Sequence, residues 1–137
     1  MTQAMQFKKL TPVMPVEAIE PCLPFWTERL GFAKTVEVPE GDQLGFVILA
    51  KDGVEVMYQS RASLLKDLPA LRQGDFRSTT ALFIEVKGMD DIIAKLKGIE
   101  VVLPERKTFY GAREFGVREP GGTLIVFAEF SEQTKKE

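Results

Sequence analysis

The sequence predicts an α+β protein built from two βαβββ repeats, whose curved mixed sheets surround a cleft and carry their helices on the outer face. Two observations lead to this prediction. The order of one strand, one helix and three strands occurs twice in the 137 residues, and landmarks recur at a nearly constant offset, as with Val16 and Val86 or Gly53 and Gly122. The length and a hydrophobic content of 45% are typical of a single globular domain over residues 1–137.

The first repeat covers about residues 9–60. Its first strand, Leu10–Val16, contains two prolines, which cannot donate to a sheet ladder and therefore indicate an edge, a strand end or a chain crossover. Apolar residues spaced by three and four predict a helix over Ile19–Leu30, which Gly31 ends. Three strands separated by turn residues follow: Ala33–Val38, Leu44–Ala50 and Val54–Gln59.

The second repeat covers about residues 79–130 and keeps the same order of elements. A linker, residues 61–78, joins the repeats and is expected to contain a short helix over Ser63–Leu71. The charged tail, residues 131–137, is expected to be frayed. The elements of this repeat are a strand over Thr79–Val86, a helix over Met89–Leu96, strands over Ile99–Leu103, Arg113–Arg118 and Leu124–Phe130, and a tight turn at Glu119–Gly122.

Histidine is absent from the chain, and cysteine occurs once, as Cys22. Zinc, iron, nickel and copper sites rely on imidazole or thiolate ligands, so the composition excludes their usual sites and leaves only oxygen ligation of Mg²⁺ or Ca²⁺. Ser-His-Asp and Cys-His catalysis is excluded for the same reason. We therefore expect neither a metal nor another cofactor, and we interpret Cys22 as structural because no basic neighbour is evident that would activate its thiol.

The charge pattern and the lone cysteine limit the partners and the location. The net charge is −2 and the basic residues are scattered, whereas a nucleic-acid groove needs many convergent Lys and Arg side chains. No uncharged apolar stretch reaches the length of a membrane span or a signal segment. A single cysteine cannot form an internal disulfide and fits a reducing compartment. We expect a cytoplasmic protein that binds neither nucleic acid nor membranes.

Three segments carry a resemblance to a known family: Thr11–Val16, Pro24–Phe32, and Tyr110–Phe115 followed by Glu119–Gly122. They are similar to motifs of the vicinal-oxygen-chelate superfamily, which comprises the glyoxalases, the extradiol dioxygenases and the bleomycin-resistance proteins. The similarity extends over about residues 9–130 and is closest to the bleomycin-resistance branch. The chain departs from the motifs at Pro24, inside the helix, and at Glu119, where aspartate is usual.

Enzymes of this superfamily hold a metal on four inward side chains, and the resemblance places those positions at Thr11, Met57, Ala81 and Val126. A hydroxyl, a thioether, a methyl and an isopropyl group cannot hold a divalent ion. The resemblance therefore implies the fold and the cleft, whereas metal-dependent glyoxalase or dioxygenase activity is excluded. It also implies a homodimer that exchanges its first strands and binds ligand in clefts between the subunits.

Alternation along the strands sorts the side chains into two faces, one of which is expected to pack under the helices. The other face, which holds the four positions above, carries two carboxylates, Glu55 and Glu85, which either pair with a cationic ligand or lie at a solvated rim. Phe109 and Tyr110 offer flat rings to a planar ligand, or else they only close the barrel. The candidate ligand-binding residues are Met57, Phe83, Tyr110, Glu55, Glu85, Phe109 and Arg113, and no catalytic residue is assigned.

These observations favour metal-free binding of a planar or cationic small molecule, of the antibiotic-sequestering kind, because sequestration needs affinity and shape but no reactive group. The alternative is a metal-independent isomerase or lyase that uses Glu55, Glu85 or Tyr110 as acid or base, for which burial would have to raise a carboxylate pKa. A third interpretation is a regulatory or structural module with a vestigial cleft. The sequence leaves the identity of the ligand open.

Overall fold

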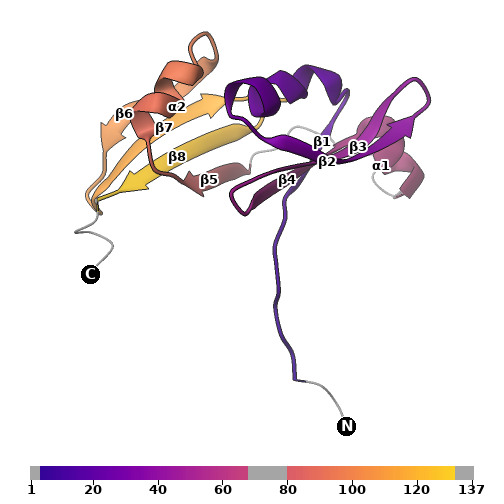
Figure 1. Ribbon diagram of the computed structural model, residues 1–137, viewed down its shortest axis with the longest axis horizontal. Coiled ribbons are helices and arrows are strands. Elements are labelled where there is room, and N and C mark those ends of the chain that lie inside the picture. The colour runs from indigo at the N-terminus through magenta and orange to yellow at the C-terminus, as the bar shows by residue number, and fades with distance from the viewer. Residues whose placement is uncertain (1–3, 68–79, 132–137) are drawn as a thin grey trace.

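The computed structural model describes residues 4–67 and 80–131. Two four-stranded mixed sheets, one from each repeat, lie side by side in an arch, with η1, η2 and α2 along its outer side (Figure 1). Each sheet is curved and ends in an edge strand, so neither closes into a barrel. These features confirm the α+β fold of two βαβββ repeats. No helix of the described residues is long and apolar enough to cross a membrane.

The sheet of the first repeat has the strand order β1-β4-β3-β2. β1 pairs in parallel with β4, with Val13 opposite Met57, and the other neighbours are antiparallel. The strand expected from Leu10 begins at Val13 and lies at the sheet edge, as its prolines require. The strands are β1 Val13–Val16, β2 Ala33–Glu40, β3 Gln43–Lys51 and β4 Val54–Ser60.

The sheet of the second repeat has the equivalent order β5-β8-β7-β6. β5 pairs in parallel with β8, with Phe83 opposite Val126. The strand expected to end at Leu103 continues through Pro104 to Lys107, because it lies at the sheet edge, where a proline costs no ladder hydrogen bond. The strands are β5 Ala81–Glu85, β6 Glu100–Lys107, β7 Ala112–Arg118 and β8 Leu124–Phe130.

The helix expected over Ile19–Leu30 is helical but irregular. It consists of a 3-10 turn, η1 (Glu20–Cys22), and a π-helical turn, η2 (Phe25–Arg29). Pro24, at the change between them, has no N–H for an α-helical hydrogen bond, which favours the wider turn. The remaining helices are α1 (Arg61–Asp67) and α2 (Met89–Lys95); the expected helix over Ser63–Leu71 begins two residues early, and its last four residues lie outside the described ranges.

The hydrophobic core lies between the sheets and the outer helices. Trp26 of η2 and Tyr58 of β4 are fully buried there, together with apolar residues of β8 such as Ile125 and Phe127. The expected alternation is observed: along each strand, the residues between the core residues point to the opposite surface of the sheet. Phe83, for example, is 56% exposed.

A buried chain of hydrogen bonds joins the two repeats. Trp26 Nε1 donates to Tyr58 Oη at 2.8 Å, and Tyr58 Oη donates to Glu119 Oε2 at 2.6 Å. Glu119 is only 1% exposed and also accepts from the backbone N–H groups of Gly121 and Thr123. The sequence predicted no more than a tight turn at Glu119–Gly122. The structure shows that this turn also fixes the second repeat against the first.

Candidate functional site

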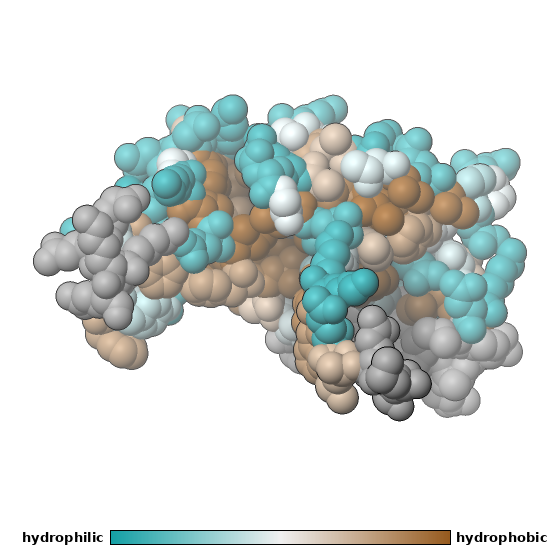
Figure 2. Space-filling view, turned by 60° about the horizontal axis from the view of Figure 1, so that its bottom comes forward, coloured by the Kyte–Doolittle hydropathy of each residue, from teal (hydrophilic) through white to brown (hydrophobic). Residues whose placement is uncertain are grey.

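The surface of the two sheets opposite the outer helices is named the open face. Its residues alternate with core residues along each strand, and partners such as Val13 and Met57 or Phe83 and Val126 lie side by side on it. Figure 2, turned toward the lower side of Figure 1, shows hydrophobic residues in a band across both repeats. By register, the open face includes Val13, Glu55, Met57, Gln59, Ala81, Phe83, Glu85, Arg106, Glu114, Arg118, Leu124, Val126 and Ala128.

Glu55 is engaged by the segment that precedes β1. Lys9 Nζ lies 2.8 Å from Glu55 Oε1, and Thr11 Oγ1 donates to the same oxygen at 3.3 Å. The hydrogen bond from Lys9, supported by the charge of its ammonium group, holds the pKa of Glu55 below its ordinary value despite some desolvation. The Glu55 carboxylate is therefore already paired with a cation of the same chain.

Glu114 is the central polar residue of the open face on the second repeat, and it is buried. Arg106 donates from Nε and Nη2 to Glu114 Oε1, at 3.1 and 2.9 Å. Tyr110 Oη donates to Glu114 Oε2. The bond from Tyr110, followed by those from Arg106, lowers the pKa of Glu114, and the same bond raises the pKa of Tyr110.

The sequence interpretation did not include Arg106 or Glu114. The signal that would have found them is their opposite charge on facing strands, since they are Cα partners in the β6–β7 hairpin. This signal was hidden because the strand was expected to end at Leu103, before Arg106. Once β6 extends to Lys107, the pair becomes a cross-strand ion pair.

Aromatic rings lie beside this cluster. The Tyr110 ring centroid is 5.1 Å from that of Phe109 in an edge-to-face arrangement, and 6.1 Å from that of Phe130. Phe109 is fully exposed, and Tyr110 keeps part of its ring accessible. The turn between β6 and β7 therefore presents flat apolar rings next to the Arg106–Glu114 ion pair.

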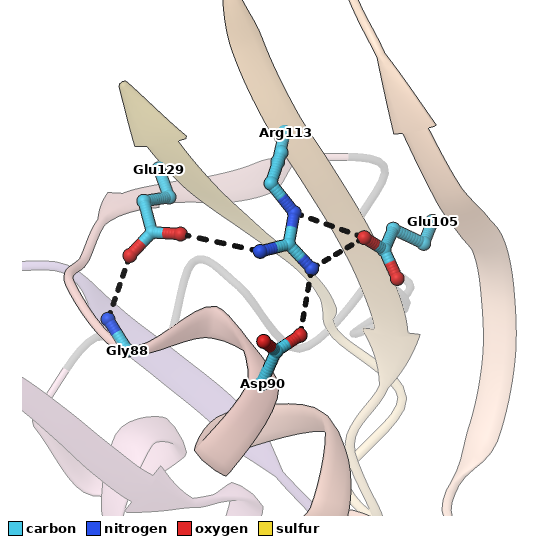
Figure 3. Close-up of polar contacts among 5 residues, drawn as sticks. All are labelled: Gly88, Asp90, Glu105, Arg113 and Glu129. Carbon is cyan, nitrogen blue, oxygen red and sulfur yellow. Dashed lines mark hydrogen bonds and ion pairs between the residues drawn. The ribbon is translucent and has the colours of Figure 1, made fainter. Parts of the chain in front are cut away.

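Arg113 lies apart from the other candidate residues. It occupies the face of β7 that also carries the core residue Phe115, and it contacts α2 (Figure 3). Its guanidinium donates to Asp90 Oδ1 and Glu105 Oε1 and lies 3.6 Å from Glu129 Oε1. Hydrogen bonds to Asp90 and Glu105 raise the pKa of Arg113. This geometry fastens α2 to the sheet.

The other candidates lie in three places. Met57 and Glu55 lie on the open face of the first repeat, and Phe83 and Glu85 on that of the second. Phe109 and Tyr110 lie at the end of the second sheet, in the β6–β7 turn. The structure thus brings Tyr110 together with Glu114 and Arg106, while β8 lies between Glu85 and Glu114.

Two hollows lie beside the sheets, and the lining of the first includes Glu85 of the open face. One, of about 510 Å³, lies at the junction of the repeats beside η2 and α2, and its lining includes Phe32, Lys51 and Ile92. The other, of about 580 Å³, lies beside Arg113, with Lys107 and Phe130 in its lining. Both are bordered by side chains of opposite charge, such as Lys51 and Asp52 in the first and Arg113 and Glu129 in the second.

The metal of the superfamily's enzymes does not fit this chain. Thr11, Met57, Ala81 and Val126 offer a hydroxyl, a thioether and two alkyl groups, which do not bind a divalent ion. The Thr11 hydroxyl is moreover hydrogen-bonded to Glu55. Within residues 4–67 and 80–131, no group of three or more His, Cys, Asp or Glu side chains is arranged to hold a metal.

Comparison with known proteins places the fold. No family model matches the chain, and no curated protein matches it. Solved structures do match. A glyoxalase/bleomycin resistance protein/dioxygenase from Nocardioides is 20% identical, with 94% of this chain and 87% of that chain covered and a TM-score of 0.67.

Two further solved structures are those of antibiotic-binding proteins. A bleomycin-binding protein from Streptomyces verticillus, complexed with copper(II)-bleomycin, is 20% identical over 94% of this chain and 100% of its own, with a TM-score of 0.63. TnmS3, an antibiotic-binding protein from a Streptomyces species, is 20% identical over 93% and 100%, with a TM-score of 0.67. The chain thus has the two-module fold of the glyoxalase and bleomycin-resistance structures, which confirms the resemblance at the level of fold.

Proposed function

We propose that this protein binds a small molecule against its open face without a metal ion. The observation that carries the proposal is the exposure of large apolar side chains on that face, Phe83 above all. They are exposed because the outer helices cover only the opposite side of the sheets. Contiguous exposed apolar surface on a folded protein usually marks a binding site. The bleomycin-binding and antibiotic-binding proteins of the same fold support this kind of role.

A second copy of the chain completes the binding cleft in this proposal. The segment before β1 extends away from the body on the open-face side (Figure 1), and its Phe7 and Leu10 are 89% and 90% exposed. Large apolar side chains on an extended segment gain stability when a partner covers them. An isologous dimer that exchanges first strands would cover both segments and turn two open faces into clefts. Light scattering at micromolar concentration should give the dimer mass, and deletion of residues 1–16 should give a monomer.

In this proposal the ligand lies against Met57, Phe83 and Tyr110, with Glu55 or Glu85 near any positive group. A thermal-shift panel of cationic glycopeptides, planar aromatic antibiotics and small keto acids supplies a probe, whose affinity is then measured by calorimetry. Tyr110→Ala should weaken binding several-fold, because stacking on the ring contributes on the order of 1 kcal/mol. Ala81→Trp should block the face. If both variants fold normally by circular dichroism and bind unchanged, the ligand lies elsewhere.

An isomerase or lyase is the second candidate, and the Tyr110–Glu114 hydrogen bond is the observation that bears on it. A general acid or base works best when its pKa lies near the operating pH. Here the pKa of Glu114 is lowered and that of Tyr110 is raised, so both move away from neutrality. The pair suits a fixed hydrogen bond better than proton transfer, and binding is the preferred function.

A further inference from the structure

We propose that Arg106 recognises an oxyanion on the ligand, so that the preferred ligand is an aromatic molecule with a carboxylate, sulfonate or phosphate substituent. This inference rests on the proposed function and specifies the ligand class of the same face. It assigns the β6–β7 end of the open face as an anion subsite. Glu114 orients the Arg106 guanidinium, and the Glu55 carboxylate of the same face is already paired with Lys9.

The orientation of Arg106 is fixed by two donors that share one acceptor. Nε and Nη2 both point at Glu114 Oε1, at 3.1 and 2.9 Å, which sets the plane of the guanidinium. Nη1 belongs to the edge directed away from Glu114, and within the described residues no hydrogen-bond partner occupies it. The Arg106 side chain is 56% exposed. A rigid guanidinium edge of this kind is pre-organised for a planar or tetrahedral oxyanion.

The charge of Glu114 does not cancel this subsite. The carboxylate is buried, and its second oxygen accepts the hydroxyl of Tyr110. Its negative charge is therefore shared with Tyr110 and Arg106, and of the two partners in the ion pair it is the positive guanidinium that is exposed. An incoming anion meets Arg106 before it meets Glu114.

A cationic ligand finds fewer partners on the same face. Glu55 is already paired with Lys9 at 2.8 Å, and Glu114 lies beneath Arg106. Glu85, the other carboxylate considered for a cation, lies on β5, with β8 between it and β7. The sequence prediction of a cationic ligand depended on Glu55 and Glu85, and the pairing of Glu55 weakens one half of it.

Tyr110 supplies the aromatic half of the subsite. Its hydroxyl and the Arg106 guanidinium bind the two oxygens of one carboxylate, so the ring and the guanidinium are neighbours. Phe109 lies edge-on to this ring at 5.1 Å between centroids. An aromatic ligand stacked on Tyr110 would therefore direct an acidic substituent toward Arg106.

Two fluorescent probes that share a naphthylamine scaffold test the inference. 8-Anilinonaphthalene-1-sulfonate carries a sulfonate, and N-phenyl-1-naphthylamine is its uncharged analogue. The wild-type protein should bind both, and Arg106→Gln should weaken the sulfonate probe about tenfold, the loss of one charge-assisted interaction. Binding of the uncharged probe should stay unchanged. The Arg106 Nε–H signal in a ¹H–¹⁵N spectrum should shift with the sulfonate probe alone.

Arg118→Gln is the matched control, because Arg118 is an exposed arginine at the far end of β7. It should change neither affinity. Arg106→Gln could destabilise the fold by leaving Glu114 without its cation, so Arg106→Gln combined with Glu114→Gln restores neutrality and should show the same selective loss. Unchanged sulfonate affinity in folded variants, or equal loss of both probes, overturns the anion subsite but leaves small-molecule binding intact. Failure of the wild type to bind either probe overturns the anion subsite and counts against the proposed function as well.

Discussion

Tyr58 of the first repeat donates a hydrogen bond of 2.6 Å to Glu119 of the second, and both side chains are buried. The hydroxyl is at the same time the acceptor for Trp26 Nε1. Burial raises the pKa of Tyr58, and the adjacent carboxylate raises it further, so the phenol stays protonated and keeps donating. The polar atoms of Trp26, Tyr58 and Glu119 therefore depend on one another for hydrogen bonds, because water does not reach them to replace a lost partner.

Removal of the Tyr58 hydroxyl should destabilise the protein. Tyr58→Phe leaves the Trp26 N–H without an acceptor and takes one donor from Glu119, and each orphaned buried group costs about 1–3 kcal/mol. Urea denaturation should show a lower midpoint at pH 7. Thr35→Val is the matched control, since it removes an exposed hydroxyl with a long 3.4 Å hydrogen bond, and its midpoint should stay close to wild type. Equal midpoints for Tyr58→Phe and wild type would contradict the prediction.

Cys22 should be unreactive in the native protein. Burial, followed by the nearby Glu119 and Glu20 carboxylates, raises the pKa of its thiol to about 12. The thiolate is the reactive form, and almost none is present at pH 8. Titration with a disulfide reagent at pH 8 should give no fast reaction before denaturation and one thiol per chain after it, since the sequence has one cysteine. A fast reaction with a natively folded sample would sink this prediction.

The ion pair of Glu114 should contribute to stability above acidic pH. Its pKa is lowered in the folded state, so the unfolded chain takes up the proton first as the pH falls. The contribution is present above the unfolded pKa of about 4.3 and is lost as the pH falls through the lower folded pKa. Relative to wild type, Glu114→Gln should be less stable at pH 7, and the difference should shrink toward pH 3.

Urea midpoints at pH 7, 5, 4 and 3 measure this effect. Glu100→Gln serves as the control, because its carboxylate is exposed and pairs only loosely with Arg118, at 3.6 Å. Its difference from wild type should be small at every pH. If the urea midpoints of wild type and Glu114→Gln change with pH in parallel, Glu114 has the same pKa in the folded and unfolded states and the prediction is wrong.

The purified protein should carry no stoichiometric transition metal. The reason is the donor set, since histidine is absent and the superfamily's ligand positions hold residues such as Met57 and Val126. Elemental analysis of protein dialysed after exposure to zinc, nickel, iron or manganese should find far less than one metal per chain. One equivalent of any of them would show that other residues supply the ligands.

Local patterns predicted the strands well where one face is buried. β8 has the predicted bounds, Leu124–Phe130, because its alternating apolar side chains reflect burial directly. The bounds of the edge strands were predicted less well. β6 runs four residues beyond its expected end, since proline is a poor stop signal in a strand that has only one neighbour.

The candidate site was predictable only in part, for a related reason. Alternation was enough to assign Met57 and Phe83 to one face. The contacts of Glu114 and Arg113 depend instead on the β6–β7 register, which contains irregularities between Val101 and Arg106. A shift of one residue moves a side chain to the other face, and nothing in the sequence alone specifies such a shift.

The buried link through Glu119 has a consequence for the relation between the two halves. Across the junction the first half contributes the donor, the Tyr58 hydroxyl, and the second contributes the acceptor, Glu119. The equivalent turn of the first half ends at Gly53 and presents the exposed Asp52, with φ at 51°, to solvent. The halves are thus complementary and not interchangeable. If the chain were split between them, each fragment would find its partner in the other fragment and not in a second copy of itself.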